Sequence, residues 1–230
     1  MFDRLKKAFG RDTRDSKLSA EGSPSQLSAG PVSEWASAHG LTFTQGTGSA
    51  AAMQGKIGGR PWRMEIGRPS RNYIVGEELR ARADLGLTED VAAMVMNRPL
   101  KDALEKKAYS MITDTLQTTA DPNLPEEMRW LAMYDEVGWE GPPAGFWQRY
   151  AVLADKREHA LAWVDDSLAK LLMGWAPGGP SAEIPFVLVL MRGKCYLRME
   201  YVPPDTGTLQ HASDIFTCAC EAAMGGFPPG

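Results

Sequence analysis

The sequence predicts an α+β fold, in which an antiparallel sheet has helices packed on one face and is preceded by a flexible basic N-terminal tail. Three observations support this prediction. Apolar and polar residues alternate in residues 61–66, 73–85 and 195–202, a period typical of half-buried strands. Tight glycine turns, at 58–59 and 192–194, join two pairs of strands as antiparallel hairpins. Apolar residues at helical spacing occupy several of the intervening stretches.

The clearest elements lie in the second half of the chain. Residues 146–154 are aromatic and β-rich, which predicts a strand, and Asp155 begins a D-x-x-E capping box that starts a helix. The apolar residues of this helix, Leu161 among them, fall within an arc of roughly 120°, which predicts one core-facing side. A continuous apolar run at 184–191 predicts a buried strand, because it is shorter than the roughly 20 residues of a membrane span. Residues 195–202 complete the hairpin.

Shorter patterns predict the remaining elements. Some are ambiguous: residues 91–96 are apolar throughout, and so short a run fits either a strand or the start of a helix. In chain order we expect a helix at 31–39, a strand from Leu41, a hairpin of 50–57 with 61–66, a strand at 73–85, helices at 99–109 and 125–134 around a strand at 111–120, a rigid loop at 138–145, and a last helix at 208–224.

The composition indicates one folded body with a separate N-terminal segment. With 230 residues, 43% of them hydrophobic, the chain can bury a substantial core. We predict an amphipathic basic segment at 1–11, a flexible linker at 12–30, a single α+β domain at 31–224 and a tail without structure at 225–230. The order strand, polar junction, helix occurs twice in the domain, which would also fit an internal duplication.

Cysteine usage and charge narrow the cellular setting. The three cysteines have no pairable spacing and the N-terminus lacks the apolar stretch of a signal peptide, so we expect a cytoplasmic protein with no transmembrane segment. The formal net charge of −4 disfavours nucleic acid as a partner. The charge is unevenly spread: residues 1–17 contain six basic and three acidic side chains, and residues 56–82 contain seven and three.

The first eleven residues have the pattern of a small interfacial anchor. Phe2, Leu5 and Phe9 share one face of a helix. Four basic side chains surround them: Arg4, Lys6, Lys7 and Arg11. Such a segment can insert its apolar face into an anionic membrane or contact an acidic partner, and the membrane attachment would be peripheral. The alternative is a frayed tail or a short helix that docks on its own domain, since isolated helices of this length are marginal.

A cluster of arginines lies on the predicted strands of residues 60–82. These are Arg60, Arg63, Arg68, Arg71, Arg80 and Arg82. Together they could form a basic sheet face that binds phosphate, an acidic lipid head group or an acidic partner. The alternative is that the interleaved Glu65, Glu77, Glu78 and Asp84 form cross-strand ion pairs with them on a solvated face.

The last predicted helix carries the densest group of residue types used in catalysis, but their spacing argues against a site. They are His211, Asp214, Cys218 and Cys220. On a helix the two cysteines point about 200° apart, and the histidine lies about two turns away, so neither metal chelation nor a thiol–imidazole pair can form within it. Cys220 should be a buried structural residue. Since no phosphate-loop, dinucleotide, nucleophile-elbow or zinc-protease motif is present, we expect no cofactor and no metal, and no catalytic residue can be named.

Two tryptophans are candidates for an exposed partner contact. Trp163 lies off the apolar arc of its predicted helix, and Trp139 lies in the proline-rich loop. Packing beneath a neighbouring loop is the alternative for both. Trp139 could also approach Arg60, Arg63, Arg80 and Arg82 in a cleft, which would assemble a ligand site from distant parts of the chain.

The C-terminal third resembles certain uncharacterised bacterial membrane-associated proteins of unknown function. The resemblance is carried by the strand at 146–154, Asp155, the amphipathic helix and the hairpin from Phe186 to Arg198. It implies an α+β body near a membrane and assigns no site residue. This chain lacks the transmembrane helices of those proteins.

Three functions follow from these patterns. The first is a non-enzymatic cytoplasmic interaction module, attached to an anionic membrane or an acidic partner through its N-terminus. The second is an enzyme or small-ligand-binding protein whose site combines the arginine-bearing strands with the Trp139 loop. The third is a subunit of a protein assembly, such as a secretion or chaperone system. A convergent polar pocket would favour the second, and a flat aromatic patch the third.

Overall fold

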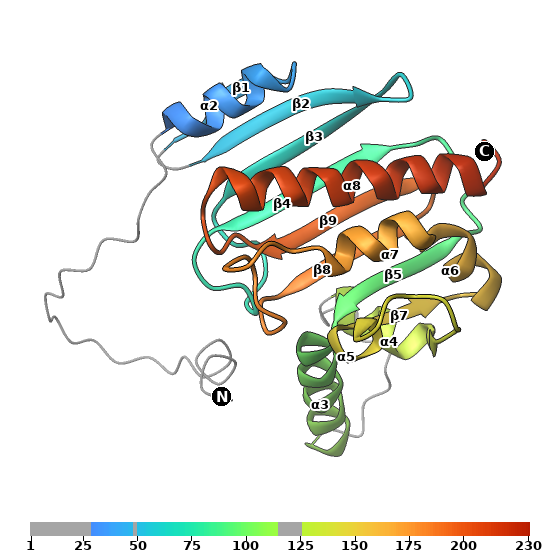
Figure 1. Cartoon of the computed structure of the whole chain (residues 1–230). Helices are drawn as coiled ribbons and strands as arrows, with labels where there is room; N and C mark the ends of the chain where they lie inside the picture. The colour runs from blue at the N-terminus through green and yellow to red at the C-terminus, as the bar shows by residue number, and fades with distance from the viewer. Residues whose placement is uncertain (1–28, 48–49, 115–125) are drawn as a thin grey trace, which may run out of the picture.

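The computed structural model describes residues 29–47, 50–114 and 126–230. The predicted anchor at 1–11, and the predicted linker up to residue 28, lie outside the described residues. The described chain forms one nine-stranded sheet in which every neighbouring pair is antiparallel, in the order β1-β2-β3-β4-β9-β8-β5-β7-β6 (Figure 1). The strands are β1 (Thr42–Gln45), β2 (Ala51–Ile57), β3 (Arg60–Gly67), β4 (Glu78–Asp84), β5 (Ala92–Asn97), β6 (Asp135–Val137), β7 (Tyr150–Ala154), β8 (Phe186–Met191) and β9 (Lys194–Glu200).

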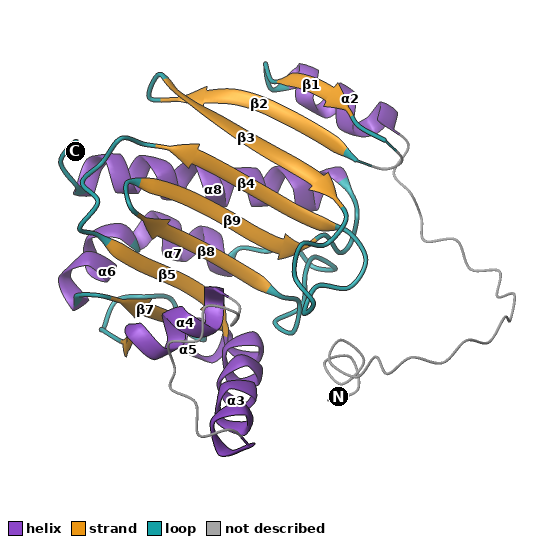
Figure 2. Cartoon of the chain, turned by 180° about the vertical axis from the view of Figure 1, so that it is seen from behind, coloured by secondary structure: helices purple, strands orange, loops and turns teal. Residues whose placement is uncertain are grey.

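Helices lie on both sides of this sheet, and the larger group lies on one face (Figure 1). That group contains α2 (Ala29–Ala38), α5 (Phe146–Arg149), α6 (Arg157–Trp163), α7 (Asp166–Met173) and the long α8 (Thr206–Gly226). On the other side, α3 (Arg98–Asp114) and α4 (Glu126–Met133) cover only the end of the sheet near β5 and β7 (Figure 2). The predicted α+β class with an antiparallel sheet is therefore confirmed, and the faces of β3, β4 and β9 that point away from α8 stay open in the described part of the chain (Figure 2).

The main core lies between the sheet and α8. Asp205 caps this helix by accepting a hydrogen bond from the Thr208 backbone N–H at 2.7 Å. Phe216 packs on Trp62 of β3, with ring centroids 5.7 Å apart. Cys220 is fully buried on the same helix face, as the sequence predicts.

Two sequence predictions around residue 150 are wrong. Residues 146–149 form the short helix α5 instead of a strand, because Gly145 takes φ 83° and its carbonyl accepts from the N–H groups of Gln148 and Arg149. The single helix expected from Asp155 is two helices, since Asp165 caps α7 by accepting from Leu168 N–H at 2.8 Å. Asp155 itself accepts from the Ala92 N–H of β5 instead of capping α6.

Three further boundaries differ from the predictions. Residues 111–114 continue α3, so the strand expected at 111–120 is wrong there, and the rest of it lies outside the described residues. The strand expected from Tyr73 begins only at Glu78, because Tyr73 lies in a loop that packs in a smaller core with Met94 of β5, Leu100 of α3 and other apolar residues on that side of the sheet. The C-terminal tail is ordered: Pro229 bridges to Leu87, and the last N–H donates to the Gly86 carbonyl at 3.0 Å.

Alanine substitutions at Gly193 and Gly59 should differ in their cost, because only Gly193 lies close to another part of the backbone. Gly193, with φ 70°, faces the carbonyl oxygen of Leu87, whereas Gly59, with φ 79°, faces open space. Gly193→Ala should lower the free energy of unfolding by about 2–3 kcal/mol, since it adds a steric clash to the cost of a left-handed residue. Gly59→Ala should cost about 1–2 kcal/mol, from the backbone alone. Urea denaturation measures both, and equal losses would contradict the close approach of Leu87.

Candidate anion-binding site

The open face of the sheet is organised in rows that cross β3, β4, β9 and β8. Strand register places Arg63 beside Arg82, Arg82 beside Tyr196, and Tyr196 beside Val189. We call these four residues the arginine row. The next row along the strands contains Glu65, Arg80, Arg198 and Val187, and we call it the paired row. Residues directly opposite each other on neighbouring strands lie on the same face of the sheet. The two rows share this face, because they are two residues apart along each strand.

These rows border a groove of about 620 Å³. Glu126 and Trp130 of α4 contribute to its lining, and Val187 and Val189 form an apolar floor that is 2% and 3% exposed. Six cationic side chains line the groove, against the two carboxylates of Glu65 and Glu126. The cations are Arg63, Arg80, Arg82, Arg192, Lys194 and Arg198. The volume falls within the range of small-ligand sites.

The paired row is largely neutralised by carboxylates. Glu65 accepts from Arg63 and, at 3.3 Å, from Arg80. Burial alone would raise the pKa of Glu65, but the hydrogen bond and charge of Arg63 and the nearby Arg80 and Arg82 hold that pKa below its ordinary value. Arg198 donates to the fully buried Glu78 at 2.7 Å. The ion pairs expected from the interleaved Glu65 and Glu78 are therefore present.

A buried cluster around Glu127 fixes α4 beside the groove. The Glu127 side chain is 0% exposed and accepts from Arg71 Nε at 2.8 Å, from the Tyr73 hydroxyl at 2.9 Å and from Arg198 Nη1 at 2.6 Å. Burial and the neighbouring carboxylate raise the pKa of Tyr73, so its hydroxyl stays protonated and donates. Because Arg198 bridges Glu127 to Glu78, α4 is tied to β4 and β9 by charge-assisted hydrogen bonds.

The uncompensated positive charge lies at the end of the groove near the β8–β9 turn. Arg82 and Arg192 are exposed, and neither forms an ion pair within the described residues. Among the described residues, Lys194 pairs with the exposed Asp84 alone, at 3.5 Å. Tyr196, which is 40% exposed, lies between Arg82 and the apolar floor. This end can therefore hold an anion through the two guanidinium groups that form no ion pair among the described residues.

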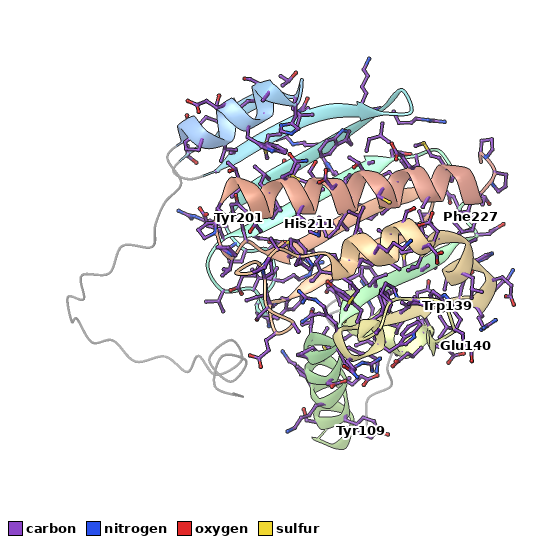
Figure 3. All side chains as sticks on the ribbon, viewed as in Figure 1. Tyr109, Trp139, Glu140, Tyr201, His211 and Phe227 are labelled. Atoms are coloured by element: carbon purple, nitrogen blue, oxygen red, sulfur yellow. The ribbon has the colours of Figure 1, made fainter. Side chains whose placement is uncertain are left out.

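The structure brings together part of the predicted ligand patch. Arg63, Arg80 and Arg82 line the groove, whereas the guanidinium group of Arg60 lies against Gly86 outside it. Trp139 packs edge-on against Trp147, with ring centroids 5.0 Å apart, on the side of the sheet that carries α7 (Figure 3). The Trp139 loop contributes no residue to the groove, so the predicted meeting of Trp139 with the arginine-bearing strands is wrong.

The predicted ligand patch missed the groove residues outside β3 and β4, among them Arg192, Lys194, Tyr196, Arg198, Glu126 and Trp130. A signal existed for part of this set, because Arg198 alternates with apolar neighbours along its strand. The alternation within one strand does not predict that β9 pairs with β4, which is what brings Arg198 into the groove.

The thiols and imidazoles lie away from the groove and have structural partners. Cys195 is fully buried, and burial together with the adjacent Cys220 thiol raises its pKa well above the ordinary value. Burial, with the charges of Asp165 and Glu221, raises the pKa of Cys218 to about 11. His211 contacts the Leu171 carbonyl at 2.8 Å through Nε2, between α8 and α7 (Figure 3). Among the described residues, no group of His, Cys, Asp and Glu is arranged to hold a metal ion.

Fold and site together define an α+β protein with a cationic groove on the open face of an antiparallel sheet. No family model and no curated protein matches the chain. A solved structure, the crystal structure of the mycobacterial trehalose monomycolate transport factor A, TtfA, is similar over 87% of this chain and 96% of that chain, with 10% sequence identity and a TM-score of 0.48. A likeness of this size supports no functional conclusion. In the part of the chain that is described, no helix has the length and apolar character needed to cross a membrane.

Proposed function

We propose that this chain is a non-enzymatic binding module that receives an anionic partner in the groove of the open sheet face. The observation that carries the proposal is the pair of exposed arginines, Arg82 and Arg192, which border a formed groove and form no ion pair among the described residues. Arginine presents a planar fork of donors that suits carboxylate and phosphate groups.

The surroundings of these arginines support binding by a preorganised site. Arg80 and Arg198 are held by Glu65, Glu78 and Glu127, so the groove wall does not need to rearrange when a ligand arrives. Ordering a long side chain at an interface costs roughly 0.5–1.5 kcal/mol, and a wall that is already ordered avoids that cost.

The lining chemistry favours binding over catalysis. The groove contains no serine, threonine, cysteine or histidine among its described lining residues. The arginines that surround Glu65 lower its pKa, so this carboxylate is a poor proton donor near neutral pH. The lining therefore supplies cations and apolar surface, and it offers no paired nucleophile and base.

Thermal denaturation with added anions tests the proposal. We expect phosphate, sulfate or an oligo-glutamate peptide to raise the melting temperature of the full chain, because a ligand that binds only the folded state stabilises it. Arg82→Ala should abolish most of that rise. Arg60→Ala is the matched control, since it removes an arginine outside the groove. If no anion stabilises the protein, or if both variants respond like the unaltered chain, the groove is not the binding site.

A second candidate function is peripheral attachment to an anionic membrane through residues 1–17. The sequence pattern of Phe2, Leu5 and Phe9 among basic residues favours it. The full chain should sediment with vesicles rich in phosphatidylglycerol but not with phosphatidylcholine vesicles, and high salt should release it. A chain that lacks residues 1–17 should stay in the supernatant, whereas Arg82→Ala should still sediment. Equal sedimentation of the full and shortened chains would exclude the N-terminal anchor.

A further inference from the structure

We infer that the groove takes a phosphomonoester with a compact body, whose phosphate group is bound by Arg82, Arg192 and Lys194. This inference rests on the proposed function and names the ligand class of the same site. All three cations line the groove at the end near the β8–β9 turn.

The charge at this end matches a dianion. Lys194 is paired with Asp84, whereas Arg82 and Arg192 form no ion pair within the described residues, which leaves two guanidinium groups available to an anion. A phosphomonoester carries about −1.5 to −2 at pH 7 and presents three acceptor oxygens. A single carboxylate would neutralise only one of the two guanidinium groups.

The strand register sets a spacing that suits one compact group. Arg82 lies directly opposite Tyr196, so Lys194 is its diagonal neighbour on the adjacent strand. Diagonal neighbours on antiparallel strands have Cα atoms about 7–8 Å apart, within reach of long side chains. Arg192 follows in the turn that joins β8 to β9, directly before Gly193. The three side chains can therefore converge on one tetrahedral anion, each from a different backbone direction.

The backbone at Arg192 is unusual for an arginine. Of the non-glycine residues that the structure describes, it is the one with positive φ, at 51°. Two-residue hairpin turns of this kind favour Asn or Gly at that position, because a Cβ atom is crowded there. Residues kept in sparsely populated conformations cluster at binding sites. The turn itself does not favour arginine at position 192, so the presence of this residue points to a binding role for its guanidinium group.

The apolar part of the groove limits the size and shape of the part of the ligand that carries the phosphate group. Its floor residues Val187 and Val189 are only 2% and 3% exposed, so they offer little surface to a long acyl chain. The accessible surface beside the cations comes from Tyr196, which is 40% exposed, and from the half-buried Trp130. These groups suit a short, flat body, such as an aromatic ring next to the phosphate.

Calorimetric titration of the full chain with phenyl phosphate and with benzoate tests the inference. Both probes carry the same ring, so their difference isolates the phosphate. We expect phenyl phosphate to bind at least tenfold more tightly than benzoate at pH 7.5, and more weakly at pH 5, because its second pKa is about 6. Arg82→Ala and Arg192→Asn should each weaken phenyl phosphate at least tenfold, and Arg60→Ala should change it less than twofold.

Arg192→Asn also separates a binding role from a structural one. The variant should keep or raise the melting temperature, because Asn suits this turn, while it loses phenyl phosphate binding. A fall in melting temperature together with unchanged binding would overturn the role given to Arg192. If benzoate binds as tightly as phenyl phosphate and depends equally on Arg82, the phosphate assignment is wrong while the proposed function stands. If neither probe, phosphate, sulfate nor oligo-glutamate shows Arg82-dependent binding, both fail.

Vesicles distinguish a soluble source of the phosphomonoester from a lipid head group. Phosphatidic acid carries a phosphomonoester, and phosphatidylserine carries a phosphodiester with a carboxylate. Using the chain without residues 1–17 removes the predicted anchor, so any remaining sedimentation that Arg82→Ala abolishes arises at the groove. Such sedimentation with phosphatidic acid alone supports a lipid head group as the source. Binding of phenyl phosphate without vesicle sedimentation supports a soluble ligand. Equal Arg82-dependent sedimentation with phosphatidylserine would overturn the choice of a phosphomonoester.

Discussion

Replacing Glu127 by alanine should lower the free energy of unfolding by about 3–5 kcal/mol, because removing one partner leaves a buried charge uncompensated. Glu127 is fully buried and accepts from Arg71, Tyr73 and Arg198. Without it, Glu78 is the one carboxylate partner that Arg198 keeps in the described part of the chain, and the Tyr73 hydroxyl loses the Glu127 acceptor. Urea denaturation monitored by circular dichroism measures the loss.

The neighbouring Glu126 provides a matched control. Its side chain is 47% exposed and contacts Arg71 at 3.5 Å, so Glu126→Ala should cost less than about 1 kcal/mol. Glu127→Gln keeps the shape and one acceptor oxygen but removes the charge, and should fall between the two alanine variants. Similar losses for Glu126→Ala and Glu127→Ala would contradict the buried cluster that the structure places beneath α4.

Glu127→Ala should also weaken anion binding, although Glu127 does not line the groove. Glu127 ties α4, which contributes Glu126 and Trp130 to the groove lining, to Arg198 of β9. Loss of this tie should loosen both the helix and an arginine of the wall. The structural and binding effects can be separated by titrating the Glu127→Gln variant at a temperature where it remains folded.

Most strands and helices were predictable because their signals are local. Residues 61–66 and 195–202 alternate directly after glycine turns, and Gly58, Gly59 and Gly193 take the positive φ values that such turns require. Residues 91–96 remained ambiguous because β5 is an interior strand, between β8 and β7, and every one of its residues is buried, which removes the alternation that distinguishes a strand.

The groove was only partly predictable because its two halves meet through a long-range pairing. Period-two alternation correctly groups Arg80 with Arg82 on one face of β4. Only the pairing of β4 with β9 adds Tyr196 and Lys194, and no local pattern specifies that pairing. The prediction that Arg60 belongs to the ligand patch is wrong for a different reason. Arg60 lies three positions from Arg63 on β3, so the alternation of the strand places the two side chains on opposite faces.

Trp163 shows how one broken helix changes the expected surface. A continuous helix places this residue off the apolar arc and Leu161 within it. The chain instead ends α6 at Trp163 and begins α7 at Asp166, which changes the direction of the helix between them. Trp163 is 0% exposed and donates from Nε1 to the Ala219 carbonyl of α8 at 2.9 Å, whereas Leu161 is 37% exposed.

Trp163→Ala should therefore lower the free energy of unfolding by about 3–5 kcal/mol, through the cavity it leaves beneath α8 and the hydrogen bond it removes. Trp163→Phe retains much of the ring volume and should recover more than half of that loss. Leu161→Ala, the exposed control, should cost less than about 1 kcal/mol. The ranking discriminates between the two arrangements: a larger loss at Leu161 than at Trp163 would mean that residues 157–173 form the continuous helix that periodicity predicts, with Asp165 inside it instead of at its cap.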